Sequence, residues 1–152
     1  MPNAVNLNKK PHGWVEEVVS ITTATNDQLK NTDSGKVFAF NRAAGTSIML
    51  PKAAAGLVFK FVVQTAFTGV AQILTDNSAD LYTGGVRMVD PANATDINYF
   101  QPDVSNDRIF DMGSDGQGRL AGGVVTFTGL SSTRWHVEGT LVGDGTLATP
   151  FE

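Results

Sequence analysis

Residues 45–64 read GTSIMLPKAAAGLVFKFVVQ, two strand-like runs joined by a short connector. Every second residue of the second run is large and apolar, and these residues fall on one face of an extended chain: Leu57, Phe59, Phe61 and Val63. Such alternation predicts a half-buried strand with its aromatic side chains inward. The first run ends at Pro51, which has no N–H to donate and therefore suits a strand end. The connector Lys52–Ala55 is compatible with a single helical turn.

Other strand-like runs occur on both sides of this block. They cover residues 14–22, 37–41, 70–75, 81–89, 97–101 and 109–112. Clusters of Asn, Asp, Pro, Ser and Gly, which favour turns, separate them about every ten residues. Near the C-terminus, residues 124–128 and 133–142 predict a hairpin joined by Gly129–Ser132. Apolar segments of helical period are nearly absent, and no internal repeat is visible. The sequence therefore predicts one all-β domain, a sandwich or barrel, over residues 14–152.

The two ends of the chain have a different composition from this middle part. Residues 1–13 are rich in Asn, Lys and Pro, and Val5 and Leu7 are their sizeable apolar side chains. A segment of this kind cannot bury enough apolar surface to fold alone, so we predict an extended N-terminal arm. Residues 143–152 are expected to form a surface extension in which Leu147 and Phe151 need something to pack on.

The overall composition excludes several classes of function. The chain has 152 residues, no cysteine, a net charge of −4 and a pI near 5.0. Without cysteine, neither disulfides nor thiolate metal ligation is possible. An acidic chain with scattered basic residues is a poor ligand for nucleic acid. No run approaches the roughly 18 apolar residues of a membrane helix, and residues 1–13 lack the apolar core of a signal peptide. We expect a soluble protein made in the cytoplasm, with no nucleic-acid or membrane partner.

Two groups of residues invite a metal hypothesis. The first, Asp111–Gly116, resembles an Asp-rich calcium loop, but the loop's third and twelfth positions, Gly113 and Gly122, carry no ligand. The second is the pair His12 and His136, which lie far apart in the sequence, whereas zinc without cysteine needs two or three converging histidines with carboxylates. The sequence favours a plain glycine turn, a solvated strand histidine, and no metal or cofactor.

Catalytic motifs are also missing from the sequence. No serine lies in a Gly-x-Ser-x-Gly elbow, and no glycine run ends as a phosphate loop does. A glycosidase would need two facing carboxylates, for which Glu16 with Glu17, or Asp103 with Asp107, are the candidates. Solvated surface acids explain these pairs more simply, so we predict that the protein is not an enzyme.

Aromatic residues provide a further alternative. Trp14 and Trp135 are candidates for a sugar-binding platform, although large aromatic side chains contribute most in a core or an interface. The triplet Asn93–Thr95 fits the N-glycosylation sequon, a pattern that is frequent by chance.

Several short motifs resemble those of small β-rich structural proteins of tailed bacteriophages. They span residues 33–63 and the last hairpin, and comprise Asp33–Lys36, Ala43–Gly45, Leu50-Pro51, Ala55-Gly56, Phe59–Phe61 and Trp135–Gly139. This layout resembles the head decoration, or cement, proteins that sit outside the major capsid shell. The same Leu-Pro, Gly and Phe pattern also occurs in phage tail fibres.

The cement resemblance implies a jelly-roll-like sandwich that forms a homotrimer and clamps neighbouring major capsid proteins on the exterior of the virion. Apolar residues on both faces of Val58–Val63 fit a trimer, although a closed barrel or a two-sided core would produce the same pattern. We expect the capsid contact in the arm, through Asn6, Leu7, Lys9, Lys10 and His12. A tail-fibre or carbohydrate-binding β module is the alternative, and a carbohydrate-active enzyme comes third.

Overall fold

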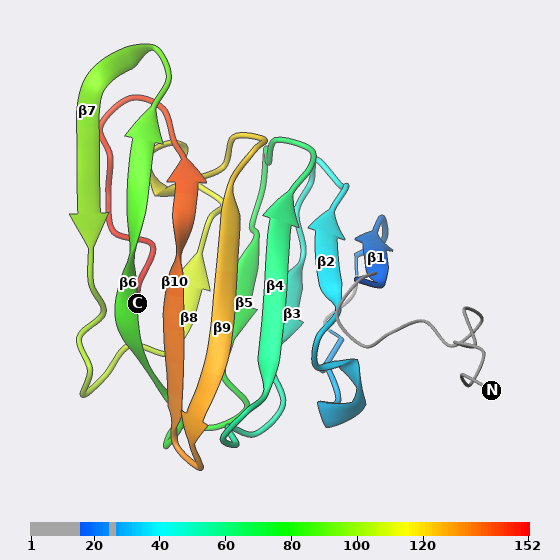
Figure 1. Cartoon of the computed structure of the whole chain (residues 1–152). Coiled ribbons are helices and arrows are strands. Elements are labelled where there is room, and N and C mark those ends of the chain that lie inside the picture. The colour runs from blue at the N-terminus through cyan, green and yellow to red at the C-terminus, as the bar shows by residue number, and fades with distance from the viewer. Residues whose placement is uncertain (1–15, 25–26) are drawn as a thin grey trace, which may run out of the picture.

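The chain forms a sandwich of two β-sheets in this computed structural model, which describes residues 16–24 and 27–152 (Figure 1). The strands of these residues are β1 (Val18–Ile21), β2 (Val37–Phe40), β3 (Ser47–Met49), β4 (Val58–Val63), β5 (Gln72–Leu74), β6 (Leu81–Asp90), β7 (Asn93–Phe100), β8 (Ile109–Asp111), β9 (Val124–Ser131) and β10 (Arg134–Val142). The predicted arm, residues 1–13, lies outside the described residues, as does Trp14.

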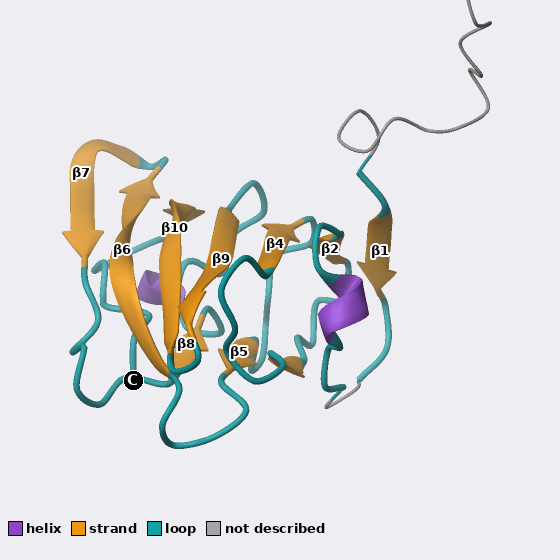
Figure 2. Ribbon diagram, turned by 60° about the horizontal axis from the view of Figure 1, so that its bottom comes forward, coloured by secondary structure: helices purple, strands orange, loops and turns teal. Residues whose placement is uncertain are grey.

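The larger sheet has the strand order β1-β2-β4-β9-β10-β6-β7, and the smaller sheet has the order β3-β5-β8. Figure 2 shows the two layers facing each other across the core. Short 3-10 turns at Asn31–Asp33 and Asp115–Gln117 are the helical segments of the described chain. No helix in residues 16–24 and 27–152 is long and apolar enough to cross a membrane. The predicted all-β sandwich is confirmed.

The N-terminal half winds back and forth between the two sheets. β1, β2 and β4 are parallel neighbours in the larger sheet, and β3 and β5 are parallel neighbours in the smaller one. β6 and β10 also pair in parallel, whereas the remaining strand pairs of the two sheets are antiparallel. This mixed pairing differs from the antiparallel connectivity of a jelly roll, which the cement resemblance implies.

The core is built mainly from aromatic side chains between the sheets. The alternation predicted for β4 is confirmed, because Phe59, Phe61 and Val63 are at most 2% exposed and Leu57 packs against the same cluster. Phe61 and Phe110 both meet Phe127 edge to face, at centroid distances of 5.7 and 5.4 Å. Edge-to-face pairs of this kind add about 0.5–1.5 kcal/mol to the benefit of burial alone.

Two expectations around residues 52–56 and 129–132 were wrong. Residues 52–55 do not form a helical turn, and the backbone N–H of Ala53 donates to the buried Asp80 carboxylate. Residues 129–131 belong to β9 rather than to the hairpin loop, which is confined to residues 132 and 133. Gly129 is a contact point, since a Cβ there would collide with the carbonyl of Ala54. A glycine inside a strand often marks such a close backbone approach.

A third difference lies at β7, which was expected to start at residue 97 after a turn over residues 90–93. The strand instead begins at Asn93, and Asp90 pairs with Asn93 across a shift in register. The Asp90 side chain accepts the backbone N–H of Ala92, which closes the turn within two residues. Local hydrogen bonding by the aspartate therefore leaves the following residues free to extend.

The C-terminal segment packs onto the domain, as its two apolar residues require. Leu147 and Phe151 are 8% and 4% exposed. Phe151 meets the ring of Phe110 at a centroid distance of 5.1 Å and forms an antiparallel bridge with it. The backbone of Glu152 exchanges hydrogen bonds of 2.8 and 2.9 Å with Ile109. Rather than lying loosely on the surface, the end of the chain covers the outer edge of β8.

Candidate functional site

The outer face of the larger sheet carries a polar hollow over β6, β7 and β10. In β10, Trp135, Val137 and Leu141 point into the core, so His136, Glu138 and Thr140 face outward. The hollow has a volume of about 580 Å³, and its polar and aromatic lining comes from four strands: Arg87, Tyr99, Thr126, His136, Glu138 and Thr140. This volume falls within the range of about 300–1,000 Å³ that is typical of small-molecule sites.

Two consecutive glycines in β6 shape this surface. A Cβ on Gly85 would lie 2.6 Å from the hydroxyl oxygen of Tyr99 and 2.7 Å from its Cζ, so the phenol end of the ring rests directly over the Gly85 backbone. A Cβ on Gly84 would lie 2.7 Å from Cε1 of His136. Gly84 also has a φ of +94°, which side-chain-bearing residues rarely adopt. The glycines thus let two rings from neighbouring strands lie against β6.

A second hollow of about 320 Å³ adjoins the first. Tyr99 and His136 line both, and Thr83, Gln101 and Val104 line the second alone. Tyr99 is 62% exposed and Val104 53% exposed. The two rings therefore stand between two connected hollows and remain accessible from solvent.

The polar groups of this surface have no partners within the described part of the chain. Neither Arg87 nor Glu138 forms a hydrogen bond or ion pair with another described residue, and neither do the side chains of Tyr99 and His136. Among the cations elsewhere, Lys36 is paired with Asp33 at 2.9 Å and Lys60 with Glu16 at 3.6 Å, whereas the exposed side chains of Lys30 and Lys52 have no ion-pair partner among the described residues. The hollow thus offers hydrogen-bonding groups that the fold itself does not use.

The acidic pairs considered for catalysis hold local structure instead of facing a cleft. Glu16 and Glu17 form ion pairs with Lys60 and Lys36, respectively. Asp107 accepts the backbone N–H of Asp103 at 2.8 Å, and Asp103 accepts both donors of Ser105. The hydrogen bonds from Ser105 lower the pKa of Asp103. Each carboxylate is therefore engaged in a turn or a surface ion pair.

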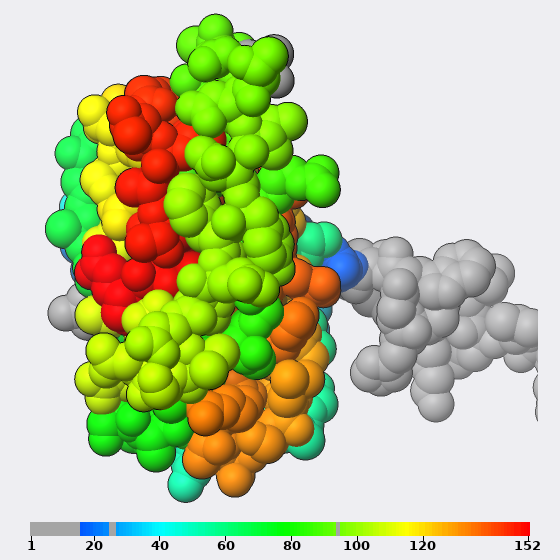
Figure 3. All heavy atoms as spheres, turned by 90° about the vertical axis from the view of Figure 1, so that its left-hand side faces the viewer, coloured from blue at the N-terminus to red at the C-terminus, as the bar shows by residue number. Residues whose placement is uncertain are grey.

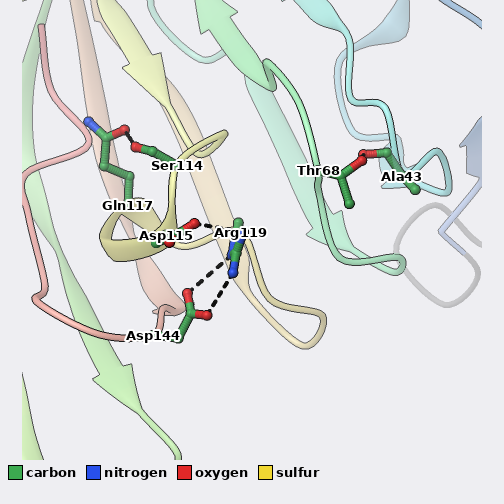
Figure 4. A network of polar contacts seen from close by, with 7 residues as sticks. All are labelled: Ala43, Thr68, Ser114, Asp115, Gln117, Arg119 and Asp144. Atoms are coloured by element: carbon green, nitrogen blue, oxygen red, sulfur yellow. Dashed lines mark hydrogen bonds and ion pairs between the residues drawn. The ribbon is translucent and has the colours of Figure 1, made fainter.

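The Asp-rich segment near residue 111 is organised around an arginine (Figure 4). Asp111 accepts the N–H of Gly113 and the side-chain amide of Gln72. Asp115 pairs with Arg119 at 2.6 Å, and Arg119 makes two further hydrogen bonds to Asp144. The hydrogen bond to Asp144 raises the pKa of Arg119. These carboxylates do not converge on one point, and the described residues contain no group of three or more candidate metal ligands.

The structure places the remaining candidates in different environments. Trp135 is completely buried against Phe59, so it is a core residue and not a sugar platform. His136 lies on the outer face beside Tyr99, as its alternation with Trp135 predicts. In the Asn93–Thr95 sequon, the Thr95 hydroxyl donates to the Asn93 side chain at 2.9 Å. The arm residues Asn6, Leu7, Lys9, Lys10 and His12 lie outside the described residues.

Free strand edges are the second distinctive feature of the surface. In the smaller sheet, β8 is covered by Phe151, and β3 is covered by the segment that forms a bridge between Gln28 and Met49. In the larger sheet, β7 ends the strand order with no described residue paired beyond it, and Figure 3 shows this strand exposed along one side of the molecule. Ile97, at the middle of β7, is 56% exposed.

The sequence did not single out Tyr99, Arg87 or β7 as surface features. A signal was present in the pair Gly84-Gly85, because glycine inside a strand indicates a close approach of another group. Which ring lies over each glycine depends on the pairing of β6 with β7 and β10. Comparisons of the chain with protein-family models, with curated proteins and with solved structures found no match.

Proposed function

We propose that this chain is a structural virion protein, a cement protein that assembles as a homotrimer and binds the major capsid protein on the outside of a phage head. The proposal combines the motif resemblance with an acidic, all-β domain. Its role is to bind and stabilise the shell, without catalysis or a cofactor.

The free edge of β7 is the observation that carries the proposal. An edge strand presents unpaired N–H and C=O groups to which another chain can add, and proteins that stay monomeric usually cover or charge such edges. Within residues 16–24 and 27–152, the chain covers both edges of its smaller sheet, whereas no residue pairs with the outer edge of the eight-residue β7. With Ile97 exposed at its centre, β7 is suited to contact with a neighbouring copy.

The opposite end of the larger sheet offers a second contact. β1 is the other terminal strand, and Val18 on it is 64% exposed. Val58, one of the outward apolar residues that suggested a trimer, is 36% exposed. The proposed arm precedes this edge in the sequence, and Lys9 and Lys10 would supply positive charge toward an acidic capsid surface.

Sedimentation of two matched variants tests the edge contact. Lysine on an edge strand blocks strand addition, so Ile97→Lys should convert a trimer to a monomer at micromolar concentration. Val70→Lys is the control. It introduces the same charge as Ile97→Lys, at a residue that is 57% exposed and lies outside β7. Wild-type protein that sediments as a monomer, or a trimer unaffected by Ile97→Lys, would contradict the edge contact.

Attachment to the capsid needs a separate test. Full-length protein and a variant lacking residues 1–10 are mixed with undecorated heads of the phage that encodes the chain, and bound copies are counted by electron microscopy. We expect density on the head exterior and a lower occupancy for the truncated variant. Density on the tail would favour the tail-fibre alternative, and the absence of binding by full-length protein would overturn the proposal.

A further inference from the structure

We propose that the outer-face hollow between Arg87 and His136 binds an uncharged saccharide, with the ring of Tyr99 as its stacking platform. The inference does not depend on the capsid proposal, because it rests on the groups that line the hollow and not on the unpaired backbone of β7. It assigns a ligand class to a surface whose polar side chains form no hydrogen bonds or ion pairs with other described residues.

The first argument is the placement of Tyr99. One part of its ring rests on Gly85, whereas 62% of the residue is exposed to solvent. Covering an exposed aromatic ring with a flat apolar partner is favourable, because it removes apolar surface from water. The C–H face of a sugar ring is such a partner. Tyrosine has only two side-chain torsions, so holding it in place for binding costs little entropy.

The second argument is the set of hydrogen-bonding groups around the ring. Sugar hydroxyls both donate and accept, so a saccharide site needs donors and acceptors side by side. The guanidinium of Arg87 supplies only donors and the carboxylate of Glu138 supplies acceptors, whereas Thr126 and Thr140 supply both. Neither Arg87 nor Glu138 has a partner among the described residues, so both are available to a ligand.

The charges of the hollow favour an uncharged ligand. Arg87 and Glu138 line the same hollow with opposite signs. A phosphate or a nucleic acid would meet the carboxylate of Glu138, and sites for such anions instead gather several Lys and Arg. A cation would meet the guanidinium of Arg87. An uncharged saccharide can form hydrogen bonds with both groups without placing a like charge beside either of them.

The size of the surface favours an oligosaccharide. The two hollows, about 580 and 320 Å³, meet at Tyr99 and His136. Thr83 and Gln101 provide polar groups in the second hollow, beyond the ring. A chain of sugar rings can therefore lie across Tyr99 and reach hydrogen-bonding groups on both sides of it.

The experiment begins with an array of neutral oligosaccharides that includes glucans, mannans and galactose-terminated chains, probed with the full-length protein. The best-binding glycan is then titrated calorimetrically against three variants. Tyr99→Ala should weaken binding at least tenfold, Tyr99→Phe should stay within about threefold of wild type because it keeps the ring, and Glu138→Gln should weaken binding. Leu130→Ala, a change at a 54% exposed residue on another part of the surface, is the matched control and should bind as wild type.

Thermal melting of each variant establishes that it is folded before binding is compared. The proposal would be overturned if the protein bound no neutral glycan on the array. Equal binding by wild type and Tyr99→Ala would also overturn it. Binding restricted to sulfated or sialylated glycans on a second, acidic array would also overturn it. The two proposals are tested by different measurements, glycan binding for one and sedimentation with capsid occupancy for the other, so failure of the glycan test leaves the capsid proposal standing, and the reverse also holds.

Discussion

The carboxylate of Asp80 accepts a hydrogen bond of 2.7 Å from the backbone N–H of Ala53, and Asp80 is completely buried. This bond connects the loop before β4 to the start of β6, 27 residues later. It supplies a partner for a backbone donor that the loop leaves outside any strand ladder.

Asp80→Ala should destabilise the fold by about 1–3 kcal/mol, because it leaves the buried N–H of Ala53 without an acceptor. The measurement is urea denaturation followed by Trp fluorescence. Asp96→Ala is the control at a partly exposed aspartate of β7, with an expected change within about 0.5 kcal/mol. Equal effects of the two substitutions would show that the Asp80 bond contributes nothing specific.

Tyr82 should make the stability depend on pH in the alkaline range. Burial raises the pKa of Tyr82 well above its ordinary value of 10.0. The folded protein therefore keeps a proton that the unfolded chain releases, so the free energy of unfolding falls as pH rises above about 10 and is unaffected by this group below that. In Tyr82→Phe the alkaline fall should be shallower. Parallel curves of unfolding free energy against pH for wild type and variant would contradict this assignment.

At neutral pH the same variant reports on a buried hydrogen bond. The Tyr82 hydroxyl donates to the carbonyl of Ile73 at 2.8 Å, which joins the larger sheet to the smaller one. Tyr82→Phe should cost about 1 kcal/mol, since the ring stays in place and only the hydroxyl is lost. Urea denaturation at pH 7 measures this cost. A variant as stable as wild type would mean that the carbonyl finds another partner.

Asp33 should contribute to stability on the acid side. The hydrogen bond from the backbone N–H of Lys30 lowers its pKa, as does that from the side chain of Lys36. The contribution is present above the unfolded pKa near 3.8 and is lost as pH falls through the folded value. Asp33→Asn should therefore flatten the fall in melting temperature below pH 4. An unchanged acid profile would remove Asp33 from this role.

The C-terminal segment should be part of the cooperative fold. Phe151→Ala removes a ring that contacts Phe110 and Tyr82, and we expect a loss of about 3–5 kcal/mol. Hydrogen exchange should show faster exchange at Ile109, whose N–H donates to Glu152. Leu130→Ala, at an exposed residue, should change stability by less than about 0.5 kcal/mol. If exchange at Ile109 were unaffected, the segment would not contribute to covering β8.

The sequence predicted most strands because the direction of a side chain along a strand is a local property. Phe59, Phe61 and Trp135 point inward wherever their strands lie in the sheet, so these core residues could be predicted from the alternation alone. The boundaries of turns were harder to predict from the sequence. Gly129 resembles a turn residue in the sequence, but it lies in β9, where the carbonyl of Ala54 leaves no room for a side chain.

The sequence by itself thus determined the all-β class, the inward faces of the main strands and the need of Leu147 and Phe151 for a packing partner. Tertiary structure alone decided the parallel winding of β1, β2 and β4, since strand pairing depends on closing long loops and not on any sequence repeat. It also decided the hollow on the outer face. Tyr99 and Gly85 are 14 positions apart in the chain, and only the register between β6 and β7 brings the ring over the glycine.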